Sequence, residues 1–170
     1  VTFQDLQIGQ IITALSELGQ LDNTIILYTA DHGDMTGDFG FWGKGCFYRG
    51  SVNVPLLISA PGITANGTVL DDLAGTHDLF PTLAALAGLP LSHKVDGSDL
   101  SARLNGSCRK QIRPYAISYY NSSPQQGYMV ANQDIKYIYN ECNCIEELYD
   151  LKRDPGEQNN LIADPEYQPA

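Results

Sequence analysis

The sequence predicts an α/β protein in which helices flank a parallel sheet, followed by a small antiparallel β subdomain. An apolar stripe with helical spacing precedes a short apolar run at residues 25–28, and this helix-then-strand order is typical of doubly wound sheets. A second apolar run, at residues 54–58, has the composition of another strand buried on both faces. Residues 111–170 differ, because short alternating segments rich in tyrosine favour antiparallel strands. We therefore expect one domain over residues 1–110 and a second over residues 111–170.

The first predicted element is a helix that ends at Gly19. Its apolar residues recur at spacings of three and four, which places them on one helical face. These residues are Phe3, Leu6, Ile8, Ile11, Ile12, Leu15 and Leu18. A stripe of this kind predicts a helix with one buried side.

A second helix is predicted to follow Asp78, which suits the N-terminal cap, and to stop at Gly88 and Pro90. Its buried side would carry Leu79, Leu83, Leu86 and Leu89. Residues 91–113 are polar and without a sustained period, so we expect a loop with one short helical turn near residues 100–104.

Short strands are predicted in the last third of the chain. Alternating apolar and tyrosine residues indicate them at residues 115–119, 128–131, 135–139 and 147–151. Asn132-Gln133-Asp134 has the composition of a turn that joins the middle two into a hairpin.

Two polar residues directly follow the first predicted strand. Ligands of open α/β sheets collect beyond the carboxyl ends of the strands, and Asp31 and His32 emerge there. A carboxylate and an imidazole side by side can face one cation if the backbone bends at once, and Gly33 permits that bend. Two ligands do not complete a site, since calcium takes about six to eight oxygens and zinc about three protein ligands. The alternative is an exposed carboxylate beside a histidine that serves only local hydrogen bonds.

Lys44 lies in a loop that alternates glycines with aromatic residues. Such a loop lets the backbone approach a ligand closely while aromatic side chains anchor it. An ammonium group presented between Gly43 and Gly45 suits a tetrahedral oxyanion such as sulfate or phosphate. The alternative is a solvated surface lysine.

These residues, taken in order, resemble the carboxyl-terminal half of the sulfatase family, within the alkaline-phosphatase-like superfamily. The motifs that carry the resemblance are Thr29-Ala30-Asp31-His32-Gly33-Asp34-Met35, Gly43-Lys44-Gly45, Ser51-Val52-Asn53-Val54-Pro55-Leu56, Thr76-His77-Asp78-Leu79-Phe80-Pro81-Thr82-Leu83 and Glu147-Leu148-Tyr149-Asp150-Leu151 with Asp154-Pro155-Gly156-Glu157. The resemblance covers essentially the whole chain. It implies the C-terminal part of an alkaline-phosphatase-like sheet flanked by helices, on which the first helix packs.

The resemblance also implies a sulfuric ester hydrolase. Asp31 and His32 would bind a divalent metal, usually calcium, and Lys44 would contact the sulfate. The Cys-x-Pro-x-Arg or Ser-x-Pro-x-Arg segment that supplies the formylglycine nucleophile of sulfatases does not occur in the sequence, and the paired aspartates that complete the metal site are missing as well. We therefore expect a fragment that is inactive alone, whose partners are the N-terminal half of the same protein and a sulfated small molecule or glycan.

Two other functions stay open. A phosphodiester or phosphonate monoester hydrolase of the same superfamily would use the Asp-His pair for manganese or zinc. A noncatalytic module would keep the fold and bind a partner or an anion. The nature of the metal would separate the first alternative from a sulfatase, and the coding sequence upstream of Val1 would separate the second.

Composition limits the partners. A formal net charge of −10 argues against nucleic acid or an anionic membrane, since both reward a basic face. The sequons at Asn66, Asn105 and Asn121 favour a secreted, periplasmic or lysosomal location, which otherwise stays open. Four cysteines leave both a disulfide and free thiols open. A sheet cut from a larger one would expose an edge and an apolar face, which favours a homo-oligomer.

Overall fold

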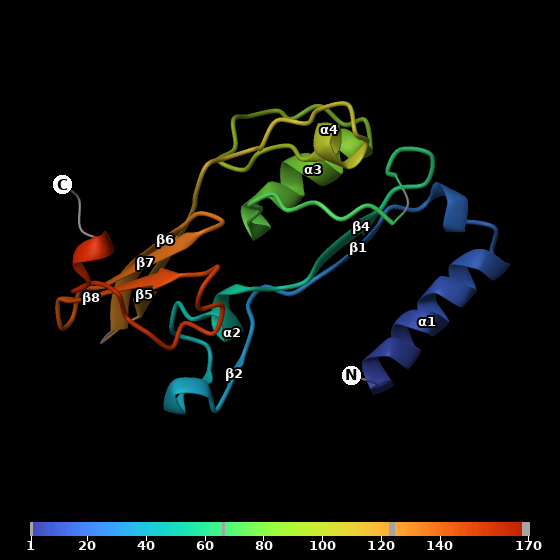
Figure 1. Cartoon of the computed structure of the whole chain (residues 1–170). Coiled ribbons are helices and arrows are strands. Elements are labelled where there is room, and N and C mark those ends of the chain that lie inside the picture. Colours follow the sequence, from blue (N-terminus) through green and yellow to red (C-terminus); the bar gives the residue numbers. More distant parts are fainter. Residues whose placement is uncertain (1, 66, 123–124, 168–170) are drawn as a thin grey trace. The chain divides into compact units, whose positions relative to one another are not determined.

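The computed structural model describes residues 2–65, 67–122 and 125–167 (Figure 1). They form two compact units, of which the first contains residues 2–28, 56–70 except 66, and 77–110, and the second contains the rest. Residues 29–55 thus belong with the C-terminal strands rather than with the N-terminal helix. The predicted domain boundary at residue 110 stays a prediction. The Asn66 sequon, and Ser123 of the Asn121 sequon, lie outside the described residues.

The first predicted helix is confirmed as α1, Thr2–Glu17. Gly19 follows it with φ 64°, a left-handed conformation that ends helices at little cost for glycine. None of the α1 residues is buried, and Phe3 and Leu18 are 73% and 72% exposed. The apolar stripe is therefore present but uncovered. No helix among the described residues is long and apolar enough to cross a membrane.

Both predicted apolar strands form, but the expected burial on both faces is not observed. β1, Ile26–Thr29, and β4, Leu56–Ser59, make a two-stranded sheet. Leu57 is 59% exposed and Tyr28 43% exposed. The reason is that no further described strand pairs with either one.

The second predicted helix is confirmed as α3, Leu79–Leu86, entered through the 3-10 turn Thr76–Asp78. Leu86 is buried, as expected, and so is Pro81 in the first turn. Leu89, which was expected on the buried side, is 63% exposed because the helix has already ended. A short helix, α4, spans Ser101–Leu104 in the region where one helical turn was expected.

Asp78 is the N-cap residue of α3, as predicted, but its side chain makes no capping hydrogen bond. Its backbone is already helical, with φ −79° and ψ −15°, and its fully buried carboxylate instead accepts the N–H of Ser98 at 2.7 Å. The hydroxyl of Thr82 donates to the Asp78 carbonyl at 2.6 Å and accepts the N–H of Leu100 at 3.0 Å. Asp78 and Thr82 thus fasten the loop before α4 to the start of α3.

The four predicted C-terminal strands are confirmed and form one antiparallel sheet in the order β5-β6-β7-β8 (Figure 1). Their bounds are Ala116–Ser122, Gln125–Ala131, Ile135–Asn140 and Ile145–Asp150. Each strand pairs with its neighbour in the sequence, so the sheet is a simple meander.

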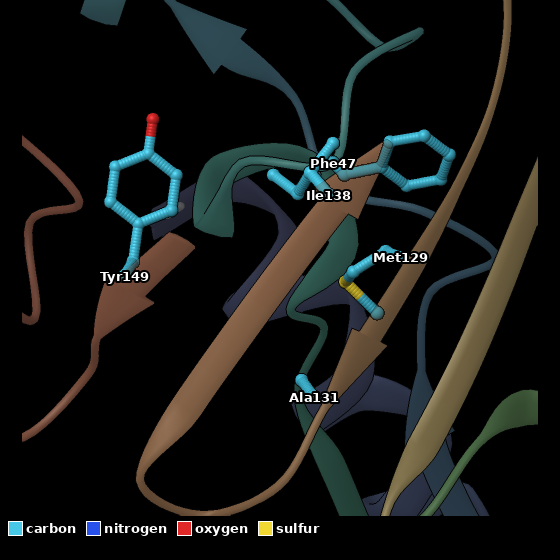
Figure 2. Close-up of a cluster of buried hydrophobic side chains, with 5 residues drawn as sticks. All are labelled: Phe47, Met129, Ala131, Ile138 and Tyr149. Atoms are coloured by element: carbon cyan, nitrogen blue, oxygen red, sulfur yellow. The ribbon is translucent and has the colours of Figure 1, made fainter. Parts of the chain in front are cut away.

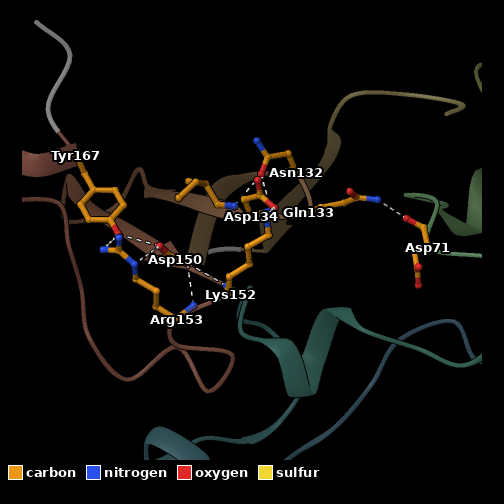
Figure 3. Close-up of polar contacts among 9 residues, drawn as sticks. Asp71, Asn132, Gln133, Asp134, Asp150, Lys152, Arg153 and Tyr167 are labelled. Atoms are coloured by element: carbon orange, nitrogen blue, oxygen red, sulfur yellow. Dashed lines mark hydrogen bonds and ion pairs between the residues drawn. The ribbon is translucent and has the colours of Figure 1, made fainter.

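The predicted turn between β6 and β7 is also confirmed. The Asn132 side-chain oxygen accepts the N–H groups of Asp134 and Ile135 at 2.8 and 2.7 Å, which closes the turn locally. Figure 3 shows this turn together with the ion pair between Asp134 and Lys152, whose atoms are 2.7 Å apart. The Gln133 amide, on the same turn, donates to the Asp71 carbonyl.

Asp150 organises the turn that follows β8 (Figure 3). Its carboxylate accepts the N–H groups of Lys152 and Arg153 at 3.0 and 2.9 Å and the Tyr167 hydroxyl at 2.8 Å. These donors, above all the Arg153 N–H, lower the pKa of Asp150. The segment after the sheet is thereby fastened to the end of β8.

The core of the second unit lies on one face of the sheet (Figure 2). It contains Met129 and Ala131 from β6, Ile138 from β7 and Tyr149 from β8, and the side chain of Phe47 joins them from the preceding loop. Figure 2 shows the Phe47 ring beside Ile138 and Met129. The sheet therefore anchors the chain three residues after Lys44.

A buried carboxylate on the same face joins two tyrosines. One oxygen of Glu147 accepts the hydroxyl groups of Tyr48 at 2.9 Å and Tyr149 at 2.6 Å. Burial, and then the contact with Glu147, raises the pKa of Tyr48 to about 12 and also raises that of Tyr149. Both effects favour the neutral phenol in the folded state.

Because the fold raises the pKa values of these two tyrosines, we expect the chain to lose stability at alkaline pH. An unfolded tyrosine loses its proton near pH 10. Between pH 10 and about 12 the unfolded chain binds fewer protons than the folded one with its raised Tyr48 pKa, so the free energy of unfolding falls as the pH rises. We expect the change in the urea midpoint between pH 8 and pH 11 to be smaller in Tyr149→Phe than in the unaltered chain. Equal changes in the two proteins would contradict this assignment.

Candidate metal and anion site

The residues of the candidate site follow β1 in the sequence and precede α2, Arg49–Val52, and a small hairpin shapes this segment. Its strands β2, Met35–Thr36, and β3, Trp42–Gly43, pair antiparallel, with Met35 opposite Gly43. This register returns the chain beside its starting point, so Lys44 comes back toward His32. Two-residue strands have no detectable sequence period, and the sequence did not predict them.

The three predicted site residues come together. Lys44 Nζ lies 2.7 Å from His32 Nε2, and His32 Nε2 lies 3.5 Å from Asp31 Oδ2. The His32 side chain is 33% exposed and that of Asp31 is 87% exposed, so both face open solvent to different degrees. The carboxylate, the imidazole and the ammonium group thus converge on a single point.

The hydrogen bonds of His32 define which nitrogen carries the proton. Nδ1 lies 2.8 Å from the Gly33 carbonyl, which only accepts, so Nδ1 must be the protonated nitrogen. Nε2 therefore has the lone pair and accepts from Lys44. A backbone carbonyl that holds one ring nitrogen and leaves the other available is the usual arrangement of a metal-binding histidine.

Gly33 is required for a reason that the sequence did not predict. It is not among the glycines with positive φ. Instead its N–H donates to the Ser51 carbonyl at 2.8 Å, and a Cβ atom at Gly33 would lie 2.0 Å from the Gly50 carbonyl oxygen. The close approach of two backbone segments, rather than a left-handed bend, excludes a side chain here.

Lys44 is flanked by two glycines in left-handed conformations, with φ 79° at Gly43 and 120° at Gly45. The prediction that aromatic residues anchor this loop is confirmed for Phe47, which is buried, and for Phe39, which stacks on Tyr48 with ring centroids 4.3 Å apart. Trp42, by contrast, is 77% exposed.

The donor set fits part of a metal site. Among the described residues there is no group of three or more His, Cys, Asp or Glu side chains that could hold a metal ion. Asp31 and His32 supply one oxygen and one nitrogen donor 3.5 Å apart, which is close enough for one cation. None of the four cysteines forms a disulfide in the structure, and none of the described ones joins this pair.

Two buried charged residues reach the same loop, and the sequence did not mark either as a site residue. Lys136 on β7 contacts Phe47, and Glu157 in the tail contacts Arg49. Lys136 lies in an alternating strand, where a lysine is normally read as solvent-facing. The motif Asp154-Pro155-Gly156-Glu157 was the only available signal.

The geometry gathers an acidic, an imidazole and an ammonium group at one loop of a mixed α/β fold, a combination that suits a cation and an oxyanion together. Residues 37–170 match the family described as N-sulphoglucosamine sulphohydrolase, C-terminal, and the chain belongs to this family. It is therefore a C-terminal region of the sulfatase family, in the alkaline-phosphatase-like superfamily, as the motifs predicted.

Relatives extend the match over nearly the whole chain. An arylsulfatase of Clostridium perfringens is 36% identical over 174 residues, which cover 99% of this chain and 35% of the relative. A protein solved in complex with its substrate D-glucosamine-2-N,6-O-disulfate is 30% identical with a TM-score of 0.90, over 96% of this chain and 35% of that one. The phosphonate monoester hydrolase of Agrobacterium radiobacter is 31% identical with a TM-score of 0.85, over 96% and 36%. The chain thus spans about a third of the length of these relatives.

Proposed function

We propose that the chain is the C-terminal part of a sulfuric ester hydrolase, to which it contributes metal and sulfate contacts. Asp31 and His32 would be ligands of a divalent metal, and Lys44 would contact the sulfate group. The observation that carries this proposal is the convergence of the three side chains, with Lys44 Nζ 2.7 Å and Asp31 Oδ2 3.5 Å from the same nitrogen of His32.

The metal contact of His32 and the sulfate contact of Lys44 both depend on the lone pair of His32 Nε2. Nε2 has one lone pair and cannot both accept from Lys44 and ligate a cation. Ligation would therefore release the Lys44 ammonium group, which then has its donors available for an anionic oxygen. A bound divalent ion would supply a positive charge that polarises the sulfate oxygens. The sulfatase resemblance favours calcium, whereas a nitrogen donor also suits manganese or zinc.

The remaining parts of the reaction lie outside this chain. The nucleophile segment and the further carboxylate ligands do not occur in the sequence, so the chain alone is expected to be inactive. The other two thirds of the relatives' length have room for them. The substrate of the whole protein would be a sulfated small molecule or glycan, in keeping with the disulfated glucosamine bound by one relative.

The part of the relatives' length that this chain does not cover would also complete the sheet that contains β1 and β4. β1 and β4 would be two strands of a larger alkaline-phosphatase-like sheet, flanked by helices that include α1. Support comes from the exposed apolar residues on both elements, such as Leu57 on β4 and Phe3 on α1. Taken alone, the chain would leave these surfaces uncovered, which favours self-association.

A phosphonate monoester hydrolase is the second candidate. The solved relative of that activity matches nearly as well as the sugar-sulfate relative, with TM-scores of 0.85 and 0.90. Sulfate and phosphonate esters present similar tetrahedral oxyanions to Lys44, so the geometry alone does not separate them.

Metal binding by the 170-residue chain tests the proposal. We expect Ca²⁺ to shift the NMR signals of Asp31 and His32 with a dissociation constant of roughly 1 mM, since two ligands make a weak site. Asp31→Ala should weaken binding by about tenfold or more, because it removes the anionic donor. Asp38→Ala is the matched control, since Asp38 is an exposed aspartate of the same loop.

Equal affinity in the unaltered chain and in Asp31→Ala would contradict the metal assignment. Assays of the whole protein on aryl sulfates and on aryl phosphonate esters separate the two hydrolases. Faster turnover of the sulfate supports the sulfatase, and faster turnover of the phosphonate supports the phosphonate monoester hydrolase. Metal preference of the chain is no substitute, because an imidazole donor favours Zn²⁺ in either case.

A further inference from the structure

An ion pair inside the second unit is almost completely removed from solvent. The side chains of Lys136 on β7 and Glu157 in the tail are 4% and 1% exposed, and their charged atoms are in direct contact. Burying two charges is costly, and an apolar pair of similar volume is often at least as stable. The pair therefore calls for a reason other than stability.

Each partner of this ion pair also holds the backbone of one loop. Lys136 Nζ donates to the Phe47 carbonyl at 3.1 Å. The second oxygen of Glu157 accepts the N–H of Arg49 at 2.8 Å. Both contacts are made to main-chain groups, so they determine where the backbone of residues 47–49 runs.

That backbone adjoins the candidate site on both sides. Phe47 follows Lys44 by three residues. Arg49 begins α2, and the Ser51 carbonyl within α2 accepts the N–H of Gly33 at 2.8 Å. The Gly33 carbonyl in turn holds Nδ1 of His32 at 2.8 Å. Short hydrogen-bonded links thus connect Glu157 to His32.

Glu157 is itself held in place by its turn. It has φ 57°, a left-handed conformation that is uncommon for glutamate. Its N–H donates to the Asp154 carbonyl at 3.0 Å, and the Asp154 carboxylate accepts the N–H of Asn159 at 2.7 Å. The tail turn therefore presents the carboxylate in a single direction, as a positioning group requires.

We propose that Lys136 and Glu157 are positioning residues that set the contact between His32 and Lys44 by holding the backbone of residues 47–49. The inference rests on the proposed function for its biological meaning, but not for its geometry. It also assigns a role to the Asp154-Pro155-Gly156-Glu157 motif, namely to hold the Glu157 carboxylate against the backbone of residues 47–49.

Glu157→Gln in the 170-residue chain tests the inference. The amide keeps the size of the side chain but removes the charge opposite Lys136. Its single oxygen can accept from Lys136 or from the Arg49 N–H, while its NH₂ group, which only donates, must face the other donor. We expect the ¹⁵N shifts of the His32 ring to lose the pattern of a single tautomer with a protonated Nδ1. We also expect hydrogen-exchange protection of the Gly33 N–H to fall by about tenfold or more.

Asp150→Asn is the matched control. It is also a carboxylate-to-amide change in the second unit, at the end of β8, and it weakens a turn through its contacts with Lys152, Arg153 and Tyr167 rather than through residues 47–51. The two variants are compared at urea concentrations that give them the same free energy of unfolding. Under these conditions we expect the His32 ring shifts of Asp150→Asn to equal those of the unaltered chain.

Equal changes of the His32 and Gly33 signals in Glu157→Gln and Asp150→Asn would overturn the inference, because the effect would then be general loosening. So would unchanged signals in Glu157→Gln. The proposed function fails separately if Ca²⁺, Mn²⁺ and Zn²⁺ all leave the NMR signals of Asp31 and His32 unchanged in the unaltered chain. The inference still holds in that case if the His32 ring shifts depend on Glu157.

Discussion

Gly33→Ala is expected to destabilise the second unit and to separate His32 from Lys44. The new Cβ would lie 2.0 Å from the Gly50 carbonyl oxygen, 3.1 Å from its carbonyl carbon and 3.2 Å from the Asn53 carbonyl oxygen. These are backbone atoms that cannot rotate aside as a flexible side chain does. The two segments must move apart, which breaks the hydrogen bond from the Gly33 N–H to Ser51. We expect a loss of about 3 kcal/mol in the free energy of unfolding.

Urea unfolding followed by tyrosine fluorescence measures that loss, and the His32 ring shifts report the site. Gly9→Ala is the control of opposite sign, because Gly9 lies inside α1 and, apart from its chain neighbours and the backbone of its own helix, no atom lies within 4 Å of its Cβ position. Replacing a glycine in a helix by alanine should stabilise by roughly 0.5–1 kcal/mol. A Gly33→Ala protein as stable as the unaltered chain would show that residues 33 and 50 are not as close as described.

The convergence of Asp31, His32 and Lys44 is the part of the site that sequence reasoning predicted best. Two general facts pointed to these residues, namely that ligands gather beyond strand ends and that a lysine between glycines suits an oxyanion. The resemblance to sulfatases was needed to prefer a shared site over exposed residues without a role. What could not be predicted was the β2–β3 hairpin that brings Lys44 back, since strands of two residues have no period to detect. The metal role of Asp31 and His32 and the anion role of Lys44 remain predictions.

Elements with several turns or regular alternation were predicted well, because their pattern repeats often enough to be read. Local chemistry at single residues was predicted less well. Asp78 has the residue type of a helix cap, yet its carboxylate reaches Ser98, twenty residues later in the chain. Only the tertiary fold brings those two groups together, so no local rule reveals the contact.

The burial expected for β1 and β4 was not observed, and the reason differs from the one for Asp78. An apolar run reflects the environment in which the complete protein places it, and this chain spans about a third of its relatives' length. The exposed Leu57 and Tyr28 therefore agree with the proposal that further strands complete the sheet. Under that proposal, the apolar runs of β1 and β4 would be buried in the whole protein, although they are exposed in this chain.

Lys136→Met is expected to cause a large loss of stability in the second unit. It leaves the Glu157 carboxylate, 1% exposed, without its countercharge, and the Phe47 carbonyl without its donor. Removing one partner of a buried ion pair typically costs about 3–5 kcal/mol. That cost is a large fraction of the total stability of about 5–15 kcal/mol that single domains possess. Urea unfolding at pH 7 measures it, with Lys152→Met as the control, because the Lys152–Asp134 pair is 70% and 50% exposed.

The double variant Lys136→Met with Glu157→Gln separates charge burial from packing. If the uncompensated carboxylate causes most of the loss, neutralising it must recover part of the stability that Lys136→Met removes. The double variant should then lose less than the sum of the two single losses, by about 1–3 kcal/mol. Strict additivity would mean that the two side chains stabilise the loop independently, through Phe47 and Arg49, and that their mutual charge matters little. The His32 ring shifts should stay altered in the double variant in either case, since both backbone contacts of residues 47–49 are weakened even when the buried charge is gone.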